Sequence, residues 1–287
     1  MSPFRIVLVI ALVLLCGSGP SKDLSPELVQ LGDLRTEVAL DGVGSPPVIF
    51  ESGFTGGLFL WRPIQSTIAK HTETLSYERA GLGRSDPRPE PRSADEIARE
   101  LHALLAAEAI GPPYILVGHS AGGLYVRVFA HLYPREIAGL VLIDPATEED
   151  YERMKAQKSV EELQKMGMSS GAIGQWRALP ETIDQGRRSW PLPVVPTVVL
   201  TSDKPLGAWP LETPEDMQRW RDSHNRLVAN IPGSRHIVIP NTDHLSILKA
   251  DEVNEQILAV IAAASAKKKT PAHNTRPFTY RHPADGS

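Results

Sequence analysis

The chain has 287 residues, of which 41% are hydrophobic and 22% are charged, and its formal net charge is −4. This length suits one large domain with a well-covered core and is short for two. The negative charge argues against the basic surface that marks nucleic-acid-binding domains, so we expect no nucleic-acid partner.

The first predicted element is a targeting segment at residues 1–18. Arg5 gives it a positive start, an unbroken apolar run follows from Ile6 to Leu15, and small residues come next. That order is typical of a secretory signal peptide, and the run is short for a membrane span. We expect a secreted or periplasmic protein with no stable membrane span in the mature chain. An uncleaved N-terminal membrane anchor and a lipidated Cys16 are the alternatives.

Five short apolar runs in the rest of the chain predict the strands of a buried sheet. They are apolar at every position, which suits strands that are covered on both faces of a parallel sheet. The runs are Val48–Phe50, Tyr114–Val117, Leu140–Ile143, Val198–Leu200 and Ile237–Ile239.

Helical patterns lie between these strands. A capping box at Ser93–Glu96 starts one helix, and apolar residues at helical spacing follow it. Strands that alternate with helices predict an α/β domain over residues 30–265, with a mostly parallel central sheet flanked by helices.

Two segments lack this alternation. Residues 146–190 lie between two predicted strands and are polar, helix-prone and dotted with Met and Trp. We interpret them as a small helical lid inserted into the domain. Residues 266–287 lose hydrophobic periodicity, which predicts a disordered tail.

The stretch Gly118-His119-Ser120-Ala121-Gly122 joins a predicted buried strand to a predicted amphipathic helix. A serine on such a turn has a strained backbone, and glycine two positions away on each side relieves the crowding. The serine hydroxyl then projects at the carboxyl edge of the sheet, where α/β folds bind ligands. We therefore predict that Ser120 is a catalytic nucleophile.

A serine hydroxyl needs a base to become a good nucleophile. His244 is the predicted base, because it follows the last predicted strand and completes the chain order Ser, Asp, His. Two aspartates, Asp144 and Asp203, each follow a predicted strand directly or nearly so. Either could reach His244 and hold its ring in the required tautomer.

Two main-chain N–H groups are predicted to bind the oxyanion of the reaction. One belongs to Ala121, the residue after the nucleophile, and the other to Phe54 in the glycine-rich loop Glu51–Gly57. Gly53 lets that loop turn tightly. This machinery requires no metal or organic cofactor, so we expect none.

These features resemble the α/β-hydrolase superfamily over roughly residues 34–264. The matching segments are Ser52–Phe54, Tyr77–Asp86, Gly118–Gly123, Leu140–Pro145 and Asp243–His244. The resemblance implies the α/β-hydrolase fold and the serine-nucleophile branch that contains esterases and lipases. It also implies that Tyr77–Asp86 is a structural loop beneath the active site, with Glu78 where the superfamily usually has aspartate.

The chain departs from the superfamily pattern at two further places. Ser52 replaces the histidine that often precedes Gly53, and Asp203 comes too early after its strand for the commoner position of the acid. A subset of the superfamily takes its acid from the end of the preceding strand, where Asp144 stands. We therefore favour Asp144 as the third catalytic residue and keep Asp203 as the alternative.

The predicted function is that of a serine hydrolase, which cleaves a carboxylic ester-like bond of a small molecule through an acyl-enzyme. The alternatives are a peptidase or thioesterase of the same fold and a non-catalytic binding protein. The serine in the turn excludes dehalogenases and epoxide hydrolases of the superfamily, which use an aspartate nucleophile. The substrate and the oligomeric state are not predicted.

Overall fold

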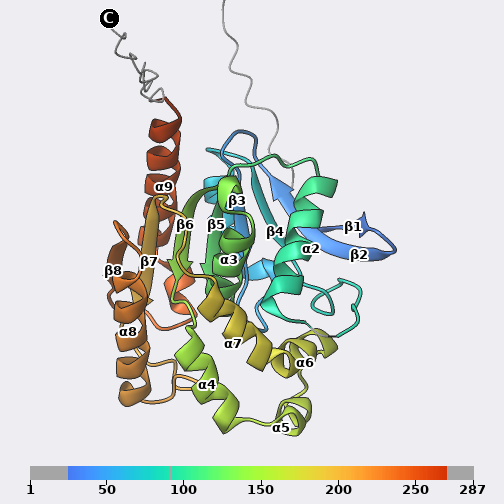
Figure 1. Cartoon of the computed structure of the whole chain (residues 1–287), viewed down its shortest axis with the longest axis vertical. Coiled ribbons are helices and arrows are strands. Elements are labelled where there is room, and N and C mark those ends of the chain that lie inside the picture. The colour runs from blue at the N-terminus through green and yellow to red at the C-terminus, as the bar shows by residue number, and fades with distance from the viewer. Residues whose placement is uncertain (1–24, 91, 270–287) are drawn as a thin grey trace, which may run out of the picture.

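An eight-stranded sheet forms the centre of the computed structural model, which describes residues 25–90 and 92–269 (Figure 1). The strands are β1 (Glu27–Leu31), β2 (Leu34–Asp41), β3 (Val48–Glu51), β4 (Thr74–Tyr77), β5 (Tyr114–His119), β6 (Ile137–Ile143), β7 (Thr197–Ser202) and β8 (Arg235–Ile239). Their spatial order is β1-β2-β4-β3-β5-β6-β7-β8. Every pairing from β4 to β8 is parallel, whereas β2 pairs antiparallel with both β1 and β4. The prediction of a mostly parallel sheet is confirmed.

All five predicted apolar runs lie in strands, and four of them fill both faces of the sheet. The run Ile237–Ile239 is the exception to the predicted burial, because β8 is an edge strand and Val238 on it is 48% exposed. In β5, Leu116 packs into one core cluster, while Ile115 and Val117 pack into the other. Because successive side chains of a strand point to opposite faces, a run that is apolar throughout requires cover on both sides.

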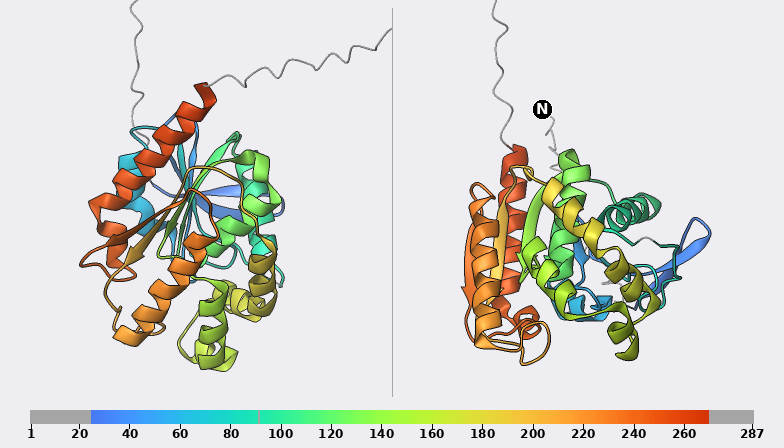
Figure 2. Two further views of the ribbon diagram at one scale, coloured as in Figure 1. Left: turned by 60° about the vertical axis from the view of Figure 1, so that its left-hand side comes forward. Right: turned by 60° about the horizontal axis from the view of Figure 1, so that its bottom comes forward.

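Helices supply that cover (Figure 2). One core cluster joins the sheet to α1 (Arg62–Ile68) and α9 (Asp251–Lys269), and the other joins it to α2 (Ala94–Ala107), α3 (Ala121–Leu132) and α8 (Pro214–Ala229). Three short 3-10 helices complete this part: η1 (Leu58–Trp61), η2 (Pro134–Glu136) and η3 (Ser246–Lys249). The predicted start of α2 is correct, since Ser93 precedes the helix and its main-chain N–H donates to Glu96 at 3.1 Å.

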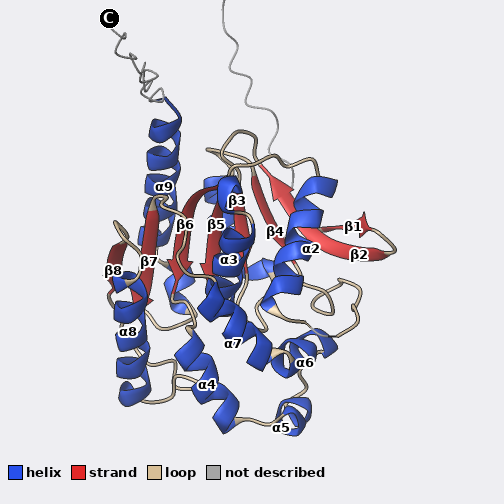
Figure 3. Cartoon of the chain, in the orientation of Figure 1, coloured by secondary structure: helices blue, strands red, loops and turns tan. Residues whose placement is uncertain are grey.

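Four helices lie between β6 and β7, and we call residues 146–190 the α4–α7 insertion. They are α4 (Glu148–Gln157), α5 (Val160–Lys165), α6 (Ser170–Arg177) and α7 (Leu179–Arg188). The arrowheads of the parallel strands point toward the end of the molecule where α4, α5 and α6 lie (Figure 3). α7 packs back against α2 and α3. The position suits the predicted lid, and its role as a lid stays a prediction.

The predicted boundaries need two corrections. The folded part begins before residue 30, because Glu27 pairs with Val38 in the antiparallel hairpin of β1 and β2. It extends past residue 265, because α9 continues to Lys269 through alanine and lysine, which have high helix propensity. The predicted signal peptide at 1–18 and the tail from residue 270 lie outside the described residues. No helix within residues 25–90 and 92–269 is long and apolar enough to cross a bilayer.

Candidate active site

Ser120 lies on the turn between β5 and α3, at the carboxyl end of the sheet. Its backbone angles are φ 54° and ψ −121°, a conformation that residues with a side chain rarely adopt unless the surrounding structure holds it. Here the main chain does so. The N–H of Ser120 donates to the oxygen of Ile143 at 3.1 Å, and its own oxygen accepts the N–H of Ala146 at 2.9 Å. Strand β6 and the start of the α4–α7 insertion thus fix the turn.

The glycines on both sides of Ser120 are required by close approaches of the backbone. A Cβ atom at Gly118 would lie 2.5 Å from the oxygen of Gly122, and one at Gly122 would lie 2.2 Å from the oxygen of Glu51. Both distances are below any real contact of a Cβ atom. The crowding predicted for this turn is therefore present.

His244 lies in the loop after β8 and bridges Ser120 and Asp144. Its Nε2 is 2.9 Å from Oγ of Ser120, and its Nδ1 is 2.7 Å from Oδ2 of Asp144. A carboxylate can only accept, so Nδ1 carries the proton and Nε2 can accept the hydroxyl proton of Ser120. The three side chains form one continuous hydrogen-bonded chain.

Asp144 is fully buried at the end of β6 and is held as a carboxylate. Ser202, at the end of β7, donates its main-chain N–H to Oδ1 and its hydroxyl to Oδ2, both at 2.9 Å. Burial acts to raise the pKa of Asp144, but the hydrogen bonds from His244 and Ser202 outweigh it, and the pKa lies below its ordinary value. Asp144 is therefore a fixed anionic acceptor next to His244.

The alternative acid, Asp203, contacts the loop that carries His244 and not its ring. Oδ1 of Asp203 accepts the N–H of Thr242 at 3.1 Å, and its main-chain N–H donates to the oxygen of Thr242 at 3.1 Å. Of the two aspartates that the sequence offered, the structure brings Asp144 to His244.

Two buried rings pack against His244, and no sequence motif predicted a role for either of them. Nε2 of His119 donates to the main-chain oxygen of His244 at 2.8 Å, and the two ring centroids are 4.7 Å apart. Burial and the neighbouring His244 lower the pKa of His119 to about 3, so this ring is neutral at neutral pH. Trp220 of α8 stands edge-on to His244 at 5.4 Å between centroids. Together they hold the imidazole in place.

The loop after β3, residues 52–57, passes beside Ser120, and we call it the Gly53 loop. A Cβ atom at Gly53 would lie 3.6 Å from Oγ of Ser120. Phe54 follows Gly53, and Ala121 is the first residue of α3. The two N–H groups predicted to bind an oxyanion therefore belong to segments that flank Ser120, and the N-terminus of α3 itself favours negative charge.

Side chains outside the Gly53 loop hold its backbone. Arg79 is buried and donates to the main-chain oxygens of Ser52, Gly53 and Phe54. Glu78 accepts the N–H of Leu58 at 2.9 Å, just past the other end of the loop. The resemblance to the superfamily implied only a structural loop here. The available signal was a charged pair that directly follows a strand, but β4 itself was not predicted.

Comparisons with known proteins agree with the fold that carries this site. The family model of the alpha/beta hydrolase fold matches residues 46–169. An esterase from Exiguobacterium antarcticum superposes with a TM-score of 0.61 at 15% identity, over 82% of this chain and 98% of that one. A thermophilic esterase from Thermogutta terrifontis superposes with a TM-score of 0.56 at 20% identity, over 83% of this chain and 98% of that one. The chain belongs to the α/β-hydrolase superfamily.

A longer relative shares this α/β-hydrolase sequence over part of its length. The probable transporter efuK of Hormonema carpetanum is 27% identical over 260 residues. The match covers 80% of this chain and 37% of efuK. The chain thus spans little more than a third of that relative.

Beside the Ser120 site of this α/β-hydrolase, a row of aromatic rings leads from the Gly53 loop through α6 to the segment between β7 and α8. The ring centroids of Phe54 and Trp176 are 5.6 Å apart, and those of Trp176 and Trp209 are 5.9 Å apart. Met168 packs against the same core cluster. The aromatic row therefore begins at the residue that carries one predicted oxyanion donor.

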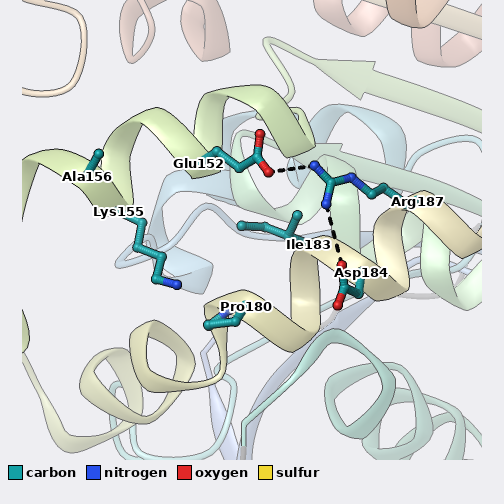
Figure 4. A pocket seen from close by; sticks show the side chains of 7 residues that line it. All are labelled: Glu152, Lys155, Ala156, Pro180, Ile183, Asp184 and Arg187. Atoms are coloured by element: carbon teal, nitrogen blue, oxygen red, sulfur yellow. Dashed lines mark hydrogen bonds and ion pairs between the residues drawn. The ribbon is translucent and has the colours of Figure 1, made fainter.

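A separate hollow of about 490 Å³ lies between α4 and α7 (Figure 4). Three of its charged side chains are paired with one another, since Arg187 contacts Glu152 at 2.5 Å and Asp184 at 3.4 Å. Lys155 also lines it. Neither Ser120 nor His244 lines it. Within residues 25–90 and 92–269, no cluster of His, Cys, Asp and Glu side chains could hold a metal ion.

Proposed function

We propose that this chain is a serine hydrolase that cleaves the carboxylic ester bond of a small molecule through an acyl-enzyme. The observation that carries the proposal is the hydrogen-bonded chain Ser120–His244–Asp144, with distances of 2.9 Å and 2.7 Å. A serine joined to a histidine, which is oriented by a carboxylate, is the arrangement that activates a hydroxyl for attack on a carbonyl carbon.

Acylation follows from the positions of these atoms. Oγ of Ser120 attacks the carbonyl carbon while Nε2 of His244 takes its proton. The buried carboxylate of Asp144 stabilises the imidazolium ion that forms. The N–H groups of Phe54 and Ala121 receive the developing oxyanion, each lowering the barrier by about 3 kcal/mol.

Acylation ends when the tetrahedral intermediate collapses. His244 gives its proton to the leaving alcohol, which departs and leaves the acyl group on Ser120. In deacylation a water molecule attacks the acyl carbonyl while Nε2 of His244 takes its proton. His244 then returns that proton to Oγ of Ser120 as the bond to the acyl group breaks and the acid product leaves. No step needs a group beyond these side chains, the main chain and water.

The apolar part of the substrate has a natural place in this scheme. Phe54 follows the glycine that approaches Ser120, and its ring starts the aromatic row with Trp176 and Trp209. We therefore propose that an acyl or alkyl group of the ester lies against this row.

The test uses the purified protein and its Ser120→Ala variant. The wild type should hydrolyse a p-nitrophenyl ester and react with a fluorophosphonate probe, and the variant should lose both, with kcat falling by about 10⁴-fold or more. Ser66→Ala is the matched control, since Ser66 is an exposed serine in α1. It should behave like the wild type.

Other substrates separate the proposal from its alternatives. Matched amides and thioesters, assayed beside the ester, would identify a peptidase or thioesterase if either were cleaved more efficiently. A wild type that neither hydrolyses any of these compounds nor reacts with the probe would refute the proposal and favour a binding protein.

We also propose that the chain is exported, on the strength of the sequence of residues 1–18 alone. Expression with and without this segment, followed by fractionation and N-terminal sequencing, tests it. A full-length protein that stays in the cytoplasm with its first residues intact would contradict it.

A further inference from the structure

The geometry points to Arg79 as a positioning residue that aims the oxyanion-binding N–H of Phe54 at the reaction centre. The inference rests on the proposed function, which names that N–H as a donor. It assigns a role to a side chain that touches neither the nucleophile nor its base.

The guanidinium group of Arg79 donates its hydrogen bonds to the backbone of the Gly53 loop and to one carboxylate. Its side chain is 2% exposed. Nη2 donates to the oxygens of Gly53 and Phe54 at 2.6 Å and 3.1 Å, and Nη1 donates to the oxygen of Ser52 at 2.8 Å. Three successive carbonyl groups are thus bound by one planar cation.

The bond to Gly53 decides the direction of the Phe54 N–H, because both groups belong to the same peptide unit. A trans peptide is planar, and its C=O and N–H point in opposite directions. The Gly53–Phe54 bond is not among the cis bonds of the described chain. When the Gly53 oxygen points to Arg79, the Phe54 N–H must point away from Arg79.

The direction of the Phe54 N–H matters for the reaction, because the adjacent residue Gly53 lies beside Ser120. The nearest atom to a Cβ at Gly53 would be Cβ of Ser120 at 3.2 Å, with Oγ at 3.6 Å. The peptide after Gly53 therefore has its oxygen fixed by a buried cation while its backbone borders the nucleophile.

The Gly53 loop needs a restraint from outside, because few hydrogen bonds within the loop fix its own backbone. Glycine has wide backbone freedom, and residues 52–57 lie in no strand. Within the loop, the Gly53 oxygen also accepts the N–H of Gly56, at a longer 3.2 Å. A charged donor forms shorter and stronger hydrogen bonds than a neutral one, so Arg79 dominates the restraint on this peptide.

Arg79 is itself fixed at its other contacts. Nη1 meets Oε1 of Glu51 at 2.5 Å, and the second oxygen of Glu51 accepts the hydroxyl of Tyr77. The guanidinium carbon lies 5.1 Å from the ring centroid of Tyr125. An anchor that cannot move transmits its position to the peptide that it holds.

A lysine cannot replace this arrangement, because an ammonium group is a point charge and lacks the planar fork that reaches several acceptors at once. Arg79→Lys therefore retains the charge and removes the geometry. Its readouts are kcat, KM and the affinity for a trifluoromethyl ketone, which adds to a nucleophilic serine and places an oxyanion in the same site.

We expect Arg79→Lys to lower kcat by about 100-fold and to weaken ketone binding in parallel, with KM little changed. The matched control is Arg92→Lys. Arg92 is equally buried, with a side chain 3% exposed, and pairs with Glu100 rather than with the Gly53 loop. It should lose stability without a selective loss of ketone affinity.

Two results would overturn the inference. A folded Arg79→Lys protein with wild-type kcat and ketone affinity would show that the loop aims itself. Equal losses in Arg92→Lys would show a general effect of disturbing a buried arginine. Neither result would touch the proposed function, which depends on Ser120→Ala.

A measurement on the wild type covers the case in which Arg79→Lys does not fold. With ¹⁵N-labelled phenylalanine, the Phe54 amide proton should move downfield and become protected from exchange when the ketone adduct forms. An amide that is unaffected by the adduct would overturn the inference, while hydrolysis and probe labelling would still stand.

Discussion

Ser202 donates a hydrogen bond to each oxygen of Asp144, through its main-chain N–H to Oδ1 and through its hydroxyl to Oδ2, both at 2.9 Å. A residue at the end of β7 thus orients the carboxylate that follows β6. The next residue, Asp203, accepts the N–H of Thr242 instead. Two neighbours in sequence therefore have separate tasks: one orients the buried carboxylate and the other secures the loop of His244.

Replacing each aspartate with asparagine should separate these tasks. Asp144→Asn removes the acceptor that fixes the tautomer of His244, so we expect kcat to fall by about 10⁴-fold with the fold intact. Asp203→Asn keeps a side-chain oxygen for Thr242 and should leave kcat close to the wild-type value. Ester hydrolysis by both purified variants is the measurement. A larger loss in Asp203→Asn would make Asp203 the acid.

Ser202→Ala should weaken the hold on Asp144 without removing it. One of its two hydrogen bonds, that of the hydroxyl, is lost, and a hydrogen bond to a charged group contributes about 2 kcal/mol. We expect kcat/KM to fall by about 10-fold. Ser189→Ala is the control, because Ser189 is also a buried serine but donates to the oxygen of Gly186. Equal effects in the two variants would mean that Asp144 needs no help from the Ser202 hydroxyl.

His119 should make the stability of the protein depend on pH. Its pKa is lowered to about 3 in the folded chain, whereas an unfolded histidine titrates near 6.5. Between these values the unfolded state binds the extra proton, so stability is full above about pH 6.5 and is lost as the pH falls toward 3. From pH 7 to pH 5, this one group should remove about 2 kcal/mol from the free energy of unfolding.

His119→Gln is the test, because glutamine does not titrate and still has an N–H for the oxygen of His244. Urea unfolding at pH 7 and pH 5 should show a smaller loss of stability in the variant than in the wild type. His131→Gln, at an exposed position of α3, is the control. If the wild type and His119→Gln lose the same free energy, His119 is not neutral in the folded chain.

The aromatic row should set the preference for the apolar group of the substrate. Trp176→Ala removes the ring that links Phe54 to Trp209, so we expect KM to rise more for long acyl chains than for acetate esters. A series of p-nitrophenyl esters of increasing chain length measures this. Trp190→Ala is the control, since Trp190 stacks on Arg127 instead. An equal change in KM along the whole series would remove the row from substrate binding.

The strands that the sequence predicts each carry a continuous run of apolar residues. β4 was missed because Thr74 and Ser76, which are polar, are buried in it. Gln65 of α1 satisfies both: Nε2 contacts Thr74 at 3.2 Å, and Oε1 accepts the hydroxyl of Ser76 at 2.7 Å. A strand with buried polar residues resembles a loop in the sequence, because the side chain that satisfies those residues lies in another element.

The site was predictable wherever a single segment carries its geometry, as at the turn of Ser120. The strand pattern alone left the choice between Asp144 and Asp203 open, because both follow neighbouring strands, and only the resemblance to the superfamily favoured Asp144. The three-dimensional placement of His244 separates the two. The role of Arg79 was not predicted, for a related reason. Its role depends on contacts with a loop more than twenty residues earlier in the chain.

The first residues of the α4–α7 insertion belong to the nucleophile's surroundings. The N–H of Ala146 is bonded to the oxygen of Ser120, and Thr147 caps α4 by accepting the N–H of Asp150. A chimera that exchanges this insertion with that of a relative should therefore join the two parents after Thr147. A junction placed before Ala146 would import a foreign peptide into the turn of Ser120, and substrate range and catalytic competence would then change together.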